Sequence, residues 1–158
     1  MTTPSVESDL GWALGTVMRA YLRMAKERLA GIPGGPRGYQ VLAAAAENGS
    51  NSQLALAKQL GVDRTVMTYL IDDLEAASLV ARTPDPADRR TRRIELTDAG
   101  RERLCELERG LRDAESHLLD PLDPDERDTL RELLHRLATR TGTLDGSACD
   151  VAEELGES

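Results

Sequence analysis

The chain has 158 residues, of which 40% are hydrophobic and 30% charged, a composition typical of one soluble globular domain with at most an added arm. No apolar run approaches the roughly 20 residues that a membrane span requires, so we expect no membrane partner. Residues 1–9 lack the basic segment and apolar stretch of a secretory signal, which favours a cytoplasmic protein. Two cysteines, Cys105 and Cys149, are too few for a disulfide framework, and no cysteine and histidine cluster suggests a zinc site or another cofactor.

The formal net charge of −8 disfavours nucleic acid at first sight, because neutralisation of phosphates by Lys and Arg supplies most non-specific affinity. The charge is unevenly distributed, however. Residues 1–51 carry five basic and four acidic side chains, residues 52–96 carry seven of each, and residues 97–158 carry eight basic and seventeen acidic ones. Within the middle segment a basic cluster places four arginines in five positions: Arg89, Arg90, Arg92 and Arg93. This local cluster can still bind the phosphates of a nucleic acid.

Helical spacing of apolar residues predicts an amphipathic helix over residues 8–30, which the Gly- and Pro-rich residues 31–36 end. A second helix is predicted through Tyr39 and Ala45. The polar residues 50–52 offer an N-cap to a short third helix, which stops at Gly61 and whose apolar residues are Leu54, Leu56, Ala57 and Leu60.

Asp63 is predicted to cap a fourth helix. Its expected buried stripe is Val66, Met67, Leu70, Ile71 and Leu74, and its expected solvent face is Arg64, Thr65, Thr68, Tyr69 and Asp72. A short helix, a glycine turn and a second helix are the spacing of a helix-turn-helix, with Ala57 where the helices approach closely and Gly61 where the turn needs a positive φ.

After Ser78 the pattern changes, and residues 79–82 and 92–96 are predicted to be two strands joined by a turn-rich, charged tip. Thr97 can cap a following helix whose apolar stripe needs a partner helix: Leu104, Leu107, Leu111, Ala114 and Leu118. A last helix is expected over residues 125–140. A helix-turn-helix followed directly by such a hairpin predicts a mainly α winged helix, in which one helix enters the major groove and the hairpin, or wing, reaches the minor groove.

Residues 53–62, Gln-Leu-Ala-Leu-Ala-Lys-Gln-Leu-Gly-Val, resemble the first helix-turn-helix element of the MarR-type transcriptional regulators, and residues 63–80 resemble their recognition helix. Residues 82–90 and 94–100 are similar to the family's wing and to the start of its next helix. The resemblance implies an N-terminal dimerisation helix within 1–36, a winged helix-turn-helix in 37–100, C-terminal dimerisation helices in 101–141 and an acidic tail in 142–158.

The resemblance further implies a homodimeric regulator, expected to be a repressor, that binds double-stranded DNA at a palindromic operator and is released by a small-molecule effector. The apolar stripes agree with a dimer. The helices over 8–30, 98–119 and 125–140 carry more apolar surface than one small winged-helix core can cover, so an identical subunit is expected to bury the rest.

Four residues at the start of the recognition helix are the expected contacts to base edges: Arg64, Thr65, Thr68 and Tyr69. Arg64 is suited to a bidentate contact with guanine, and the threonine methyl groups are suited to thymine. The alternative for these side chains is an ordinary solvated helix face.

The wing also contributes expected DNA contacts. By resemblance to the family's Asp-x-Arg wing, Arg90 enters the minor groove, Arg89 lies near a phosphate and Asp88 organises the tip. The resemblance also implies an ion pair between Asp63 and the wing arginine. The alternative is an ordinary charged loop.

An effector pocket is expected beside the first helix, because family members bind effectors between the dimerisation helices and the winged helix. Four residues would suit a planar aromatic acid or a phenol: Trp12, Arg19, Tyr21 and His117. The alternative is that Trp12 and Tyr21 pack the dimer core while Arg19 and His117 lie on solvated faces.

A redox-responsive regulator is a further alternative. Cys105 follows Leu104 in the heptad helix and Cys149 lies in the tail, whereas peroxide-sensing members of the family carry their reactive cysteine in the first helix. We therefore expect Cys105 to be a buried structural residue.

Two other classes of protein agree less well with the sequence. An enzyme is disfavoured, because His117 and His135 are the only imidazoles and no phosphate loop or nucleophile elbow is present. A winged-helix module that binds protein is permitted by the neutral balance of residues 52–96 but disfavoured by the wing, which carries arginines and no aromatic side chain.

Overall fold

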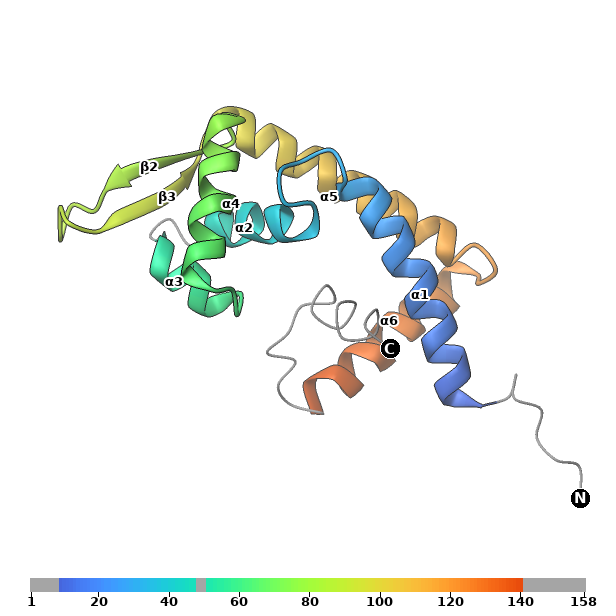
Figure 1. Cartoon of the computed structure of the whole chain (residues 1–158). Coiled ribbons are helices and arrows are strands. Elements are labelled where there is room, and N and C mark those ends of the chain that lie inside the picture. Colours follow the sequence, from blue (N-terminus) through green and yellow to red (C-terminus); the bar gives the residue numbers. More distant parts are fainter. Residues whose placement is uncertain (1–8, 48–50, 141–158) are drawn as a thin grey trace, which may run out of the picture.

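The computed structural model describes residues 9–47 and 51–140, and the fold is mainly helical with one small sheet (Figure 1). The elements in chain order are α1 (Leu10–Leu29), α2 (Pro36–Glu47), β1 (Asn51–Ser52), α3 (Gln53–Gln59), α4 (Arg64–Ala76), β2 (Val80–Pro84), β3 (Arg92–Leu96), α5 (Asp98–Leu118) and α6 (Pro124–Arg140). The predicted class, a winged helix-turn-helix with long flanking helices, is confirmed. The predicted tail and Cys149 lie outside the described residues.

The helix-turn-helix is formed by α3 and α4, and side-chain caps define both starts. The Ser52 hydroxyl accepts a hydrogen bond from the Ala55 N–H at 3.1 Å, and an Asp63 carboxylate oxygen accepts one from the Thr65 N–H at 2.8 Å. Between the helices Gly61 has a φ of 64°, the left-handed conformation that glycine adopts without strain. The expected caps and the expected glycine turn are therefore present.

The wing is the hairpin of β2 and β3, which projects from the body of the chain in Figure 1. The strands are antiparallel, with Arg82 opposite Ile94 and Pro84 opposite Arg92. Strand β1 pairs with the other edge of β3 and gives the sheet order β1-β3-β2. This third strand was not predicted, because two residues are too short for an alternating pattern and residues 50–52 offered only the signal of a helix cap.

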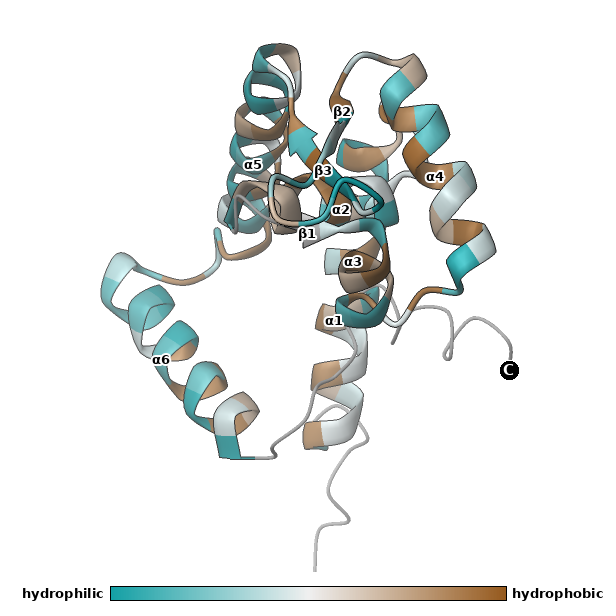
Figure 2. Cartoon of the chain, turned by 90° about the vertical axis from the view of Figure 1, so that its left-hand side faces the viewer, coloured by the Kyte–Doolittle hydropathy of each residue, from teal (hydrophilic) through white to brown (hydrophobic). Residues whose placement is uncertain are grey.

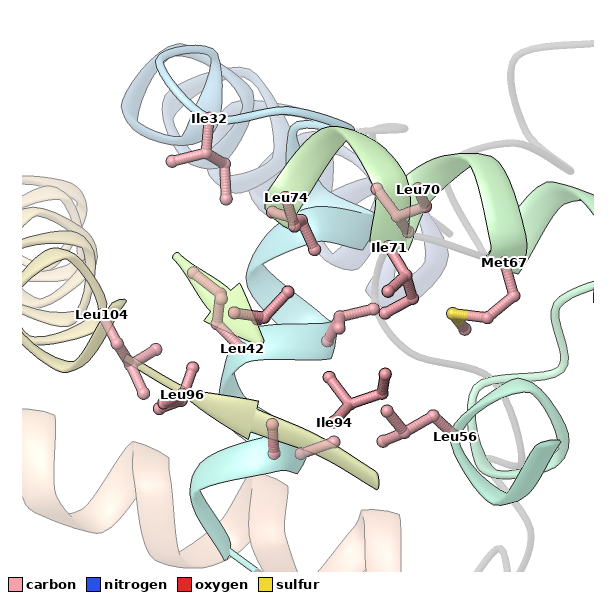
Figure 3. Packing of buried hydrophobic residues seen from close by; sticks show 14 of the residues in the cluster. Ile32, Leu42, Leu56, Met67, Leu70, Ile71, Leu74, Ile94, Leu96 and Leu104 are labelled. Carbon is pink, nitrogen blue, oxygen red and sulfur yellow. The ribbon is translucent and has the colours of Figure 1, made fainter. Parts of the chain in front are cut away.

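The core fills the space enclosed by α2, α3, α4, the sheet and the start of α5 (Figure 3). Its fully buried side chains come from α2, α3, α4 and the sheet and include Leu42, Leu56, Met67, Ile71, Leu74 and Ile94, and α5 adds the buried Leu104 and Leu107. Apolar burial at this density supplies most of the folding free energy, at about 25 cal/mol per Å² of apolar surface. The recognition helix is therefore held by one face and keeps the other for solvent.

Two apolar residues of the helix-turn-helix are exposed, and one of them, Val66, was predicted to be buried. Val66 is 43% exposed because it lies one position, about 100° of helical rotation, before Met67 and falls at the edge of the buried stripe. Leu54 is 44% exposed; it lies about 160° around α3 from the buried Leu56 and about 60° from the buried Ala57, outside the arc that these two residues define.

Helices α1 and α6 leave apolar side chains uncovered. On α1 the stripe is buried at Ala25 and Leu29 but exposed toward the N-terminus at Leu10, Leu14, Val17 and Met18. No residue of α6 is buried, and this helix turns away from α5 in both overall views (Figures 1 and 2). Within the described residues, no helix is long and apolar enough to span a membrane.

Candidate nucleic-acid interface

The exposed face of α4 and the wing border one groove. Its volume is about 440 Å³, and its lining includes Arg64 and Thr68 from the recognition helix together with Arg90 and Arg92 from the wing. The first residues of α3, Gln53 and Leu54, form another wall. Residues that lie more than 20 positions apart in the sequence therefore meet at one surface.

The predicted recognition residues divide into two groups. Arg64 and Thr68 line the groove, whereas Thr65 and Tyr69 are exposed on α4 but do not line it. Tyr69 is 67% exposed, a large fraction for an aromatic side chain, so its ring has little contact with the rest of the chain. All four side chains lie outside the core, as expected for residues that contact another molecule.

Asp88 shapes the tip of the wing. One of its carboxylate oxygens accepts a hydrogen bond from the Arg90 N–H at 3.0 Å, and the other accepts one from the Thr91 hydroxyl at 3.2 Å. Asp85 accepts a hydrogen bond from the Ala87 N–H at 2.8 Å, which lowers the pKa of its carboxyl. These bonds hold the loop so that the side chains of Arg89 and Arg90 are exposed.

The four arginines of the wing are not equivalent. Arg93 is half-buried and forms an ion pair with Asp85, with 3.2 Å between its Nε and a carboxylate oxygen. Arg89, Arg90 and Arg92 are exposed, and Arg90 and Arg92 line the groove. Arg93 therefore braces the wing, and the other three remain available for phosphates.

Asp63 does not form the ion pair with the wing arginine that the resemblance implies. Within the described residues its carboxylate bonds to the backbone N–H groups of Thr65 and Val66. These backbone bonds lower the pKa of Asp63, which keeps the N-cap ionised at neutral pH and places negative charge at the positive end of the α4 dipole.

The four predicted effector residues are not gathered in the groove. Trp12 and Arg19 are exposed on α1, and His117 is 81% exposed near the end of α5. Tyr21 is half-buried and lies near Tyr39 of α2; burial raises the pKa of the Tyr39 hydroxyl, and the charges of Glu108 and Tyr21 raise it further. Tyr21 is thus the one of the four that faces the packed junction of helices.

Cys105 is exposed, and the prediction of a buried structural cysteine was wrong. Leu104 and Leu107 are the buried residues of this part of α5, and Cys105 lies about 100° around the helix from Leu104. The stripe faces the core, so the next residue along the chain faces solvent.

Sequence reasoning assigned no individual role to Gln53 or Arg82 and named Arg92 only as part of the arginine cluster; the structure places all three at or beside the groove. Arg82 is 21% exposed and lies 2.6 Å from both Asp72 and Glu75 of α4. An arginine in the last position of the predicted strand 79–82, ten residues after Asp72 on the preceding helix, was the signal available for this contact.

A short helix, a glycine turn, an exposed second helix and an arginine-bearing hairpin, joined at one groove, define a winged helix-turn-helix protein. The model of the MarR family matches residues 36–91. A protein of Thauera aromatica, described as a transcriptional regulatory protein for the hcr operon, is 31% identical over 134 residues, which are 84% of this chain and 81% of that protein. The chain belongs to the MarR family of DNA-binding transcriptional regulators.

Solved structures agree with this assignment. The YusO protein of Bacillus subtilis superposes with a TM-score of 0.74 at 25% identity, covering 88% of this chain and 99% of that one. The repressor CouR bound to a 23-mer DNA duplex gives a TM-score of 0.67 at 28% identity, covering 87% and 98%. CouR of Rhodococcus jostii RHA1 bound to p-coumaroyl-CoA gives 0.64 at 27% identity, covering 86% and 96%.

Proposed function

We propose that the protein is a homodimeric repressor that binds a palindromic operator in the cytoplasm, and that an aromatic effector releases it. The groove that joins Arg64 and Thr68 of the recognition helix to Arg90 of the wing is the observation that carries the DNA-binding geometry. A dimer would set two such grooves about one duplex turn, roughly 34 Å, apart.

The recognition helix and the wing take different roles in this proposal. Arg64, Thr65, Thr68 and Tyr69 lie at the N-terminal half of α4, the part of such a helix that contacts base edges in the major groove. Arg90 enters the minor groove, whose negative potential attracts arginine, and Arg89 contacts a phosphate. Within the described part of the chain, Arg64, Arg89 and Arg90 form no ion pair that would compete with DNA.

Arginine replacement in the wing tests these roles. Arg90→Ala should weaken binding to a duplex from the protein's own upstream DNA by about 1–3 kcal/mol, roughly 5- to 150-fold, at moderate salt. Arg89→Ala should instead lower the slope of log affinity against log salt by about one unit. Fluorescence anisotropy across a salt series measures both quantities.

Arg109→Ala is the matched control, because this arginine is exposed on α5, outside the groove lining. It should change neither the affinity nor the salt slope. Unchanged affinity of Arg90→Ala would remove the minor-groove role from the proposal.

Effector release is proposed at the face of α1 and α5, where the candidate residues are Trp12, Arg19, Tyr21 and His117. The complex of CouR with p-coumaroyl-CoA supports an aromatic ligand for a fold of this kind. Arginine can pair with a carboxylate, and aromatic side chains can stack on a planar ligand.

Trp12 provides an intrinsic probe, because it is the only tryptophan in the chain. Titration with aromatic acids and phenols should change its fluorescence and lower operator affinity over the same concentration range. Arg19→Met should shift both curves to higher concentrations of a carboxylate ligand but not of a neutral phenol. A flat fluorescence signal with unaltered operator binding would contradict the assignment of this site.

A further inference from the structure

A chain of hydrogen bonds links strand β2 to the recognition helix through Gln53, the first residue of α3. The Arg82 guanidinium is held against α4 by Asp72 and Glu75, each at 2.6 Å. Its Nε and Nη2 also donate to the Gln53 Oε1, at 3.5 Å each. Because a guanidinium has only donors, the Gln53 amide must turn its oxygen toward Arg82 and its nitrogen away.

The nitrogen of this amide meets the recognition helix at Thr68. Gln53 Nε2 donates to the Thr68 Oγ1 at 2.7 Å, and the Thr68 hydroxyl donates in turn to the Arg64 carbonyl oxygen at 2.9 Å. A hydroxyl has one proton and two lone pairs. The proton and one lone pair of Thr68 are therefore used within the protein, although the side chain is exposed and lines the groove.

We propose that Gln53 is a positioning residue that fixes the Thr68 side chain so that its methyl group, and not its hydroxyl proton, is offered to a base. The inference rests on the proposed DNA-binding function. In the major groove only thymine presents a 5-methyl group, and apolar contact with that methyl is a common means of selecting it. Thr68 then selects thymine by shape, and Arg82 holds the amide that makes this possible.

The network also explains why a threonine needs support here. In a helix the threonine side chain is divided between two rotamers, since the hydroxyl can bond to the preceding turn in more than one way. A donor from outside the helix favours the rotamer whose oxygen faces it. Gln53 supplies that donor at 2.7 Å, so loss of Gln53 would leave the methyl and the hydroxyl free to exchange places.

The experiment uses the full chain and a fluorescein-labelled duplex that the wild-type protein selects from a random-sequence pool. Each thymine of the selected duplex is replaced in turn by deoxyuridine, which lacks only the 5-methyl group. The measured quantity is the ratio of Kd for the uracil duplex to Kd for the thymine duplex. At one thymine in each half-site the wild-type ratio should be about fourfold, the factor for burying one methyl group.

Variants of the pair separate positioning from general stability. Thr68→Ser lacks the methyl and Gln53→Ala frees the rotamer, so both should lower the ratio at that thymine to about one. Thr68→Val keeps a methyl in either orientation and should retain the ratio. The double variant Gln53→Ala/Thr68→Val should therefore recover the Kd ratio of the wild-type protein. A merely structural role for Gln53 would not produce this recovery.

Two further variants complete the set. The Gln53→Glu side chain can still accept a hydrogen bond from Arg82 but has no N–H to donate to Thr68. Its Kd ratio should therefore fall to about one, as in Gln53→Ala. Gln59→Ala, the same change at the exposed far end of α3, should leave the ratio unchanged.

An unaltered ratio in Gln53→Ala, or no recovery in the double variant, would overturn the inference while leaving the DNA-binding function in place. A wild-type chain that selects no duplex from the pool would instead contradict the proposed function, and the inference with it.

Discussion

The double variant Leu14→Glu/Leu133→Glu should be a monomer at micromolar concentration and should lose at least about a hundredfold in operator affinity. Leu14 and Leu133 are exposed apolar residues on α1 and α6, 49% and 47% accessible in the single chain. Burial against an identical subunit would remove this surface from water, and a glutamate at each position would instead have to be desolvated. Loss of the dimer separates the two DNA contacts, and with them the gain of about 10²–10⁴ that bivalent binding supplies.

The reason to expect a partner on α1 lies in its own stripe. Leu14 and Met18 lie on the same helical face as Ala25 and Leu29, which are buried within the chain. The apolar stripe continues along the whole of α1, but other parts of the chain cover only its C-terminal half. A surface built for burial over its full length and covered over half of it fits a dimer interface.

Thr16→Glu/His135→Glu is the control for this prediction. It adds the same charges to the same helices at exposed positions away from the apolar stripes. Analytical ultracentrifugation gives the oligomeric state, and anisotropy gives the affinity. A dimer that survives the leucine replacements would exclude these faces as the interface.

Gly100→Ala should destabilise the fold by about 3 kcal/mol or more, which lowers Tm by roughly 6–12 °C for a chain of this size. Gly100 lies in the first turn of α5, where an added Cβ would stand 1.9 Å from the Leu79 carbonyl oxygen and 2.9 Å from its carbon. Both are backbone atoms at the start of the wing, so no side-chain rotation can relieve the contact. The Leu79 oxygen also accepts the Thr97 N–H at 3.1 Å, which limits its movement.

Gly110→Ala provides the matched change in the same helix. An added Cβ at Gly110 meets only the Arg28 side chain, at 3.7 Å. Alanine is favoured over glycine in a helix by about 1 kcal/mol, so this variant should be neutral or more stable. Thermal unfolding followed by circular dichroism compares the two. Equal Tm values for both variants would contradict the close packing of α5 on the wing.

Much of the fold could be predicted from local signals. Asp63 and Thr97 have side chains suited to an N-cap, and Gly61 can adopt the positive φ of a turn. All three residues have these roles in the structure. The periodic stripe of α4 likewise identified Met67, Leu70, Ile71 and Leu74 as buried. These features depend on residues within one or two turns of each other.

The errors came where burial depends on what lies nearby in space. Val66 is apolar and was predicted to be buried, but it falls outside the arc of α4 that meets the core. Cys105 follows a buried leucine and is still exposed. The arc that a helix buries is set by the elements packed against it, which hydrophobicity alone does not specify.

The two sides of the groove, the recognition helix and the wing, could be predicted from the sequence, but the hydrogen bonds that link them could not. The sequence indicated the recognition helix and the arginine cluster separately. The contacts of Gln53 with Arg82 and Thr68 span 29 and 15 residues, and glutamine and threonine are common on solvated surfaces. Only the three-dimensional structure shows that they form one polar chain.

Thr97 joins the wing to the longest helix without a flexible segment. It follows β3 directly, its hydroxyl donates to the Ser78 carbonyl oxygen at 2.6 Å, and the same oxygen atom accepts the Gly100 N–H at 2.9 Å. Because no flexible residue separates them, a tilt of α5 is transmitted through this joint to the arginine tip of the wing. A shift of the helix far from DNA can therefore change the fit of the wing to a duplex.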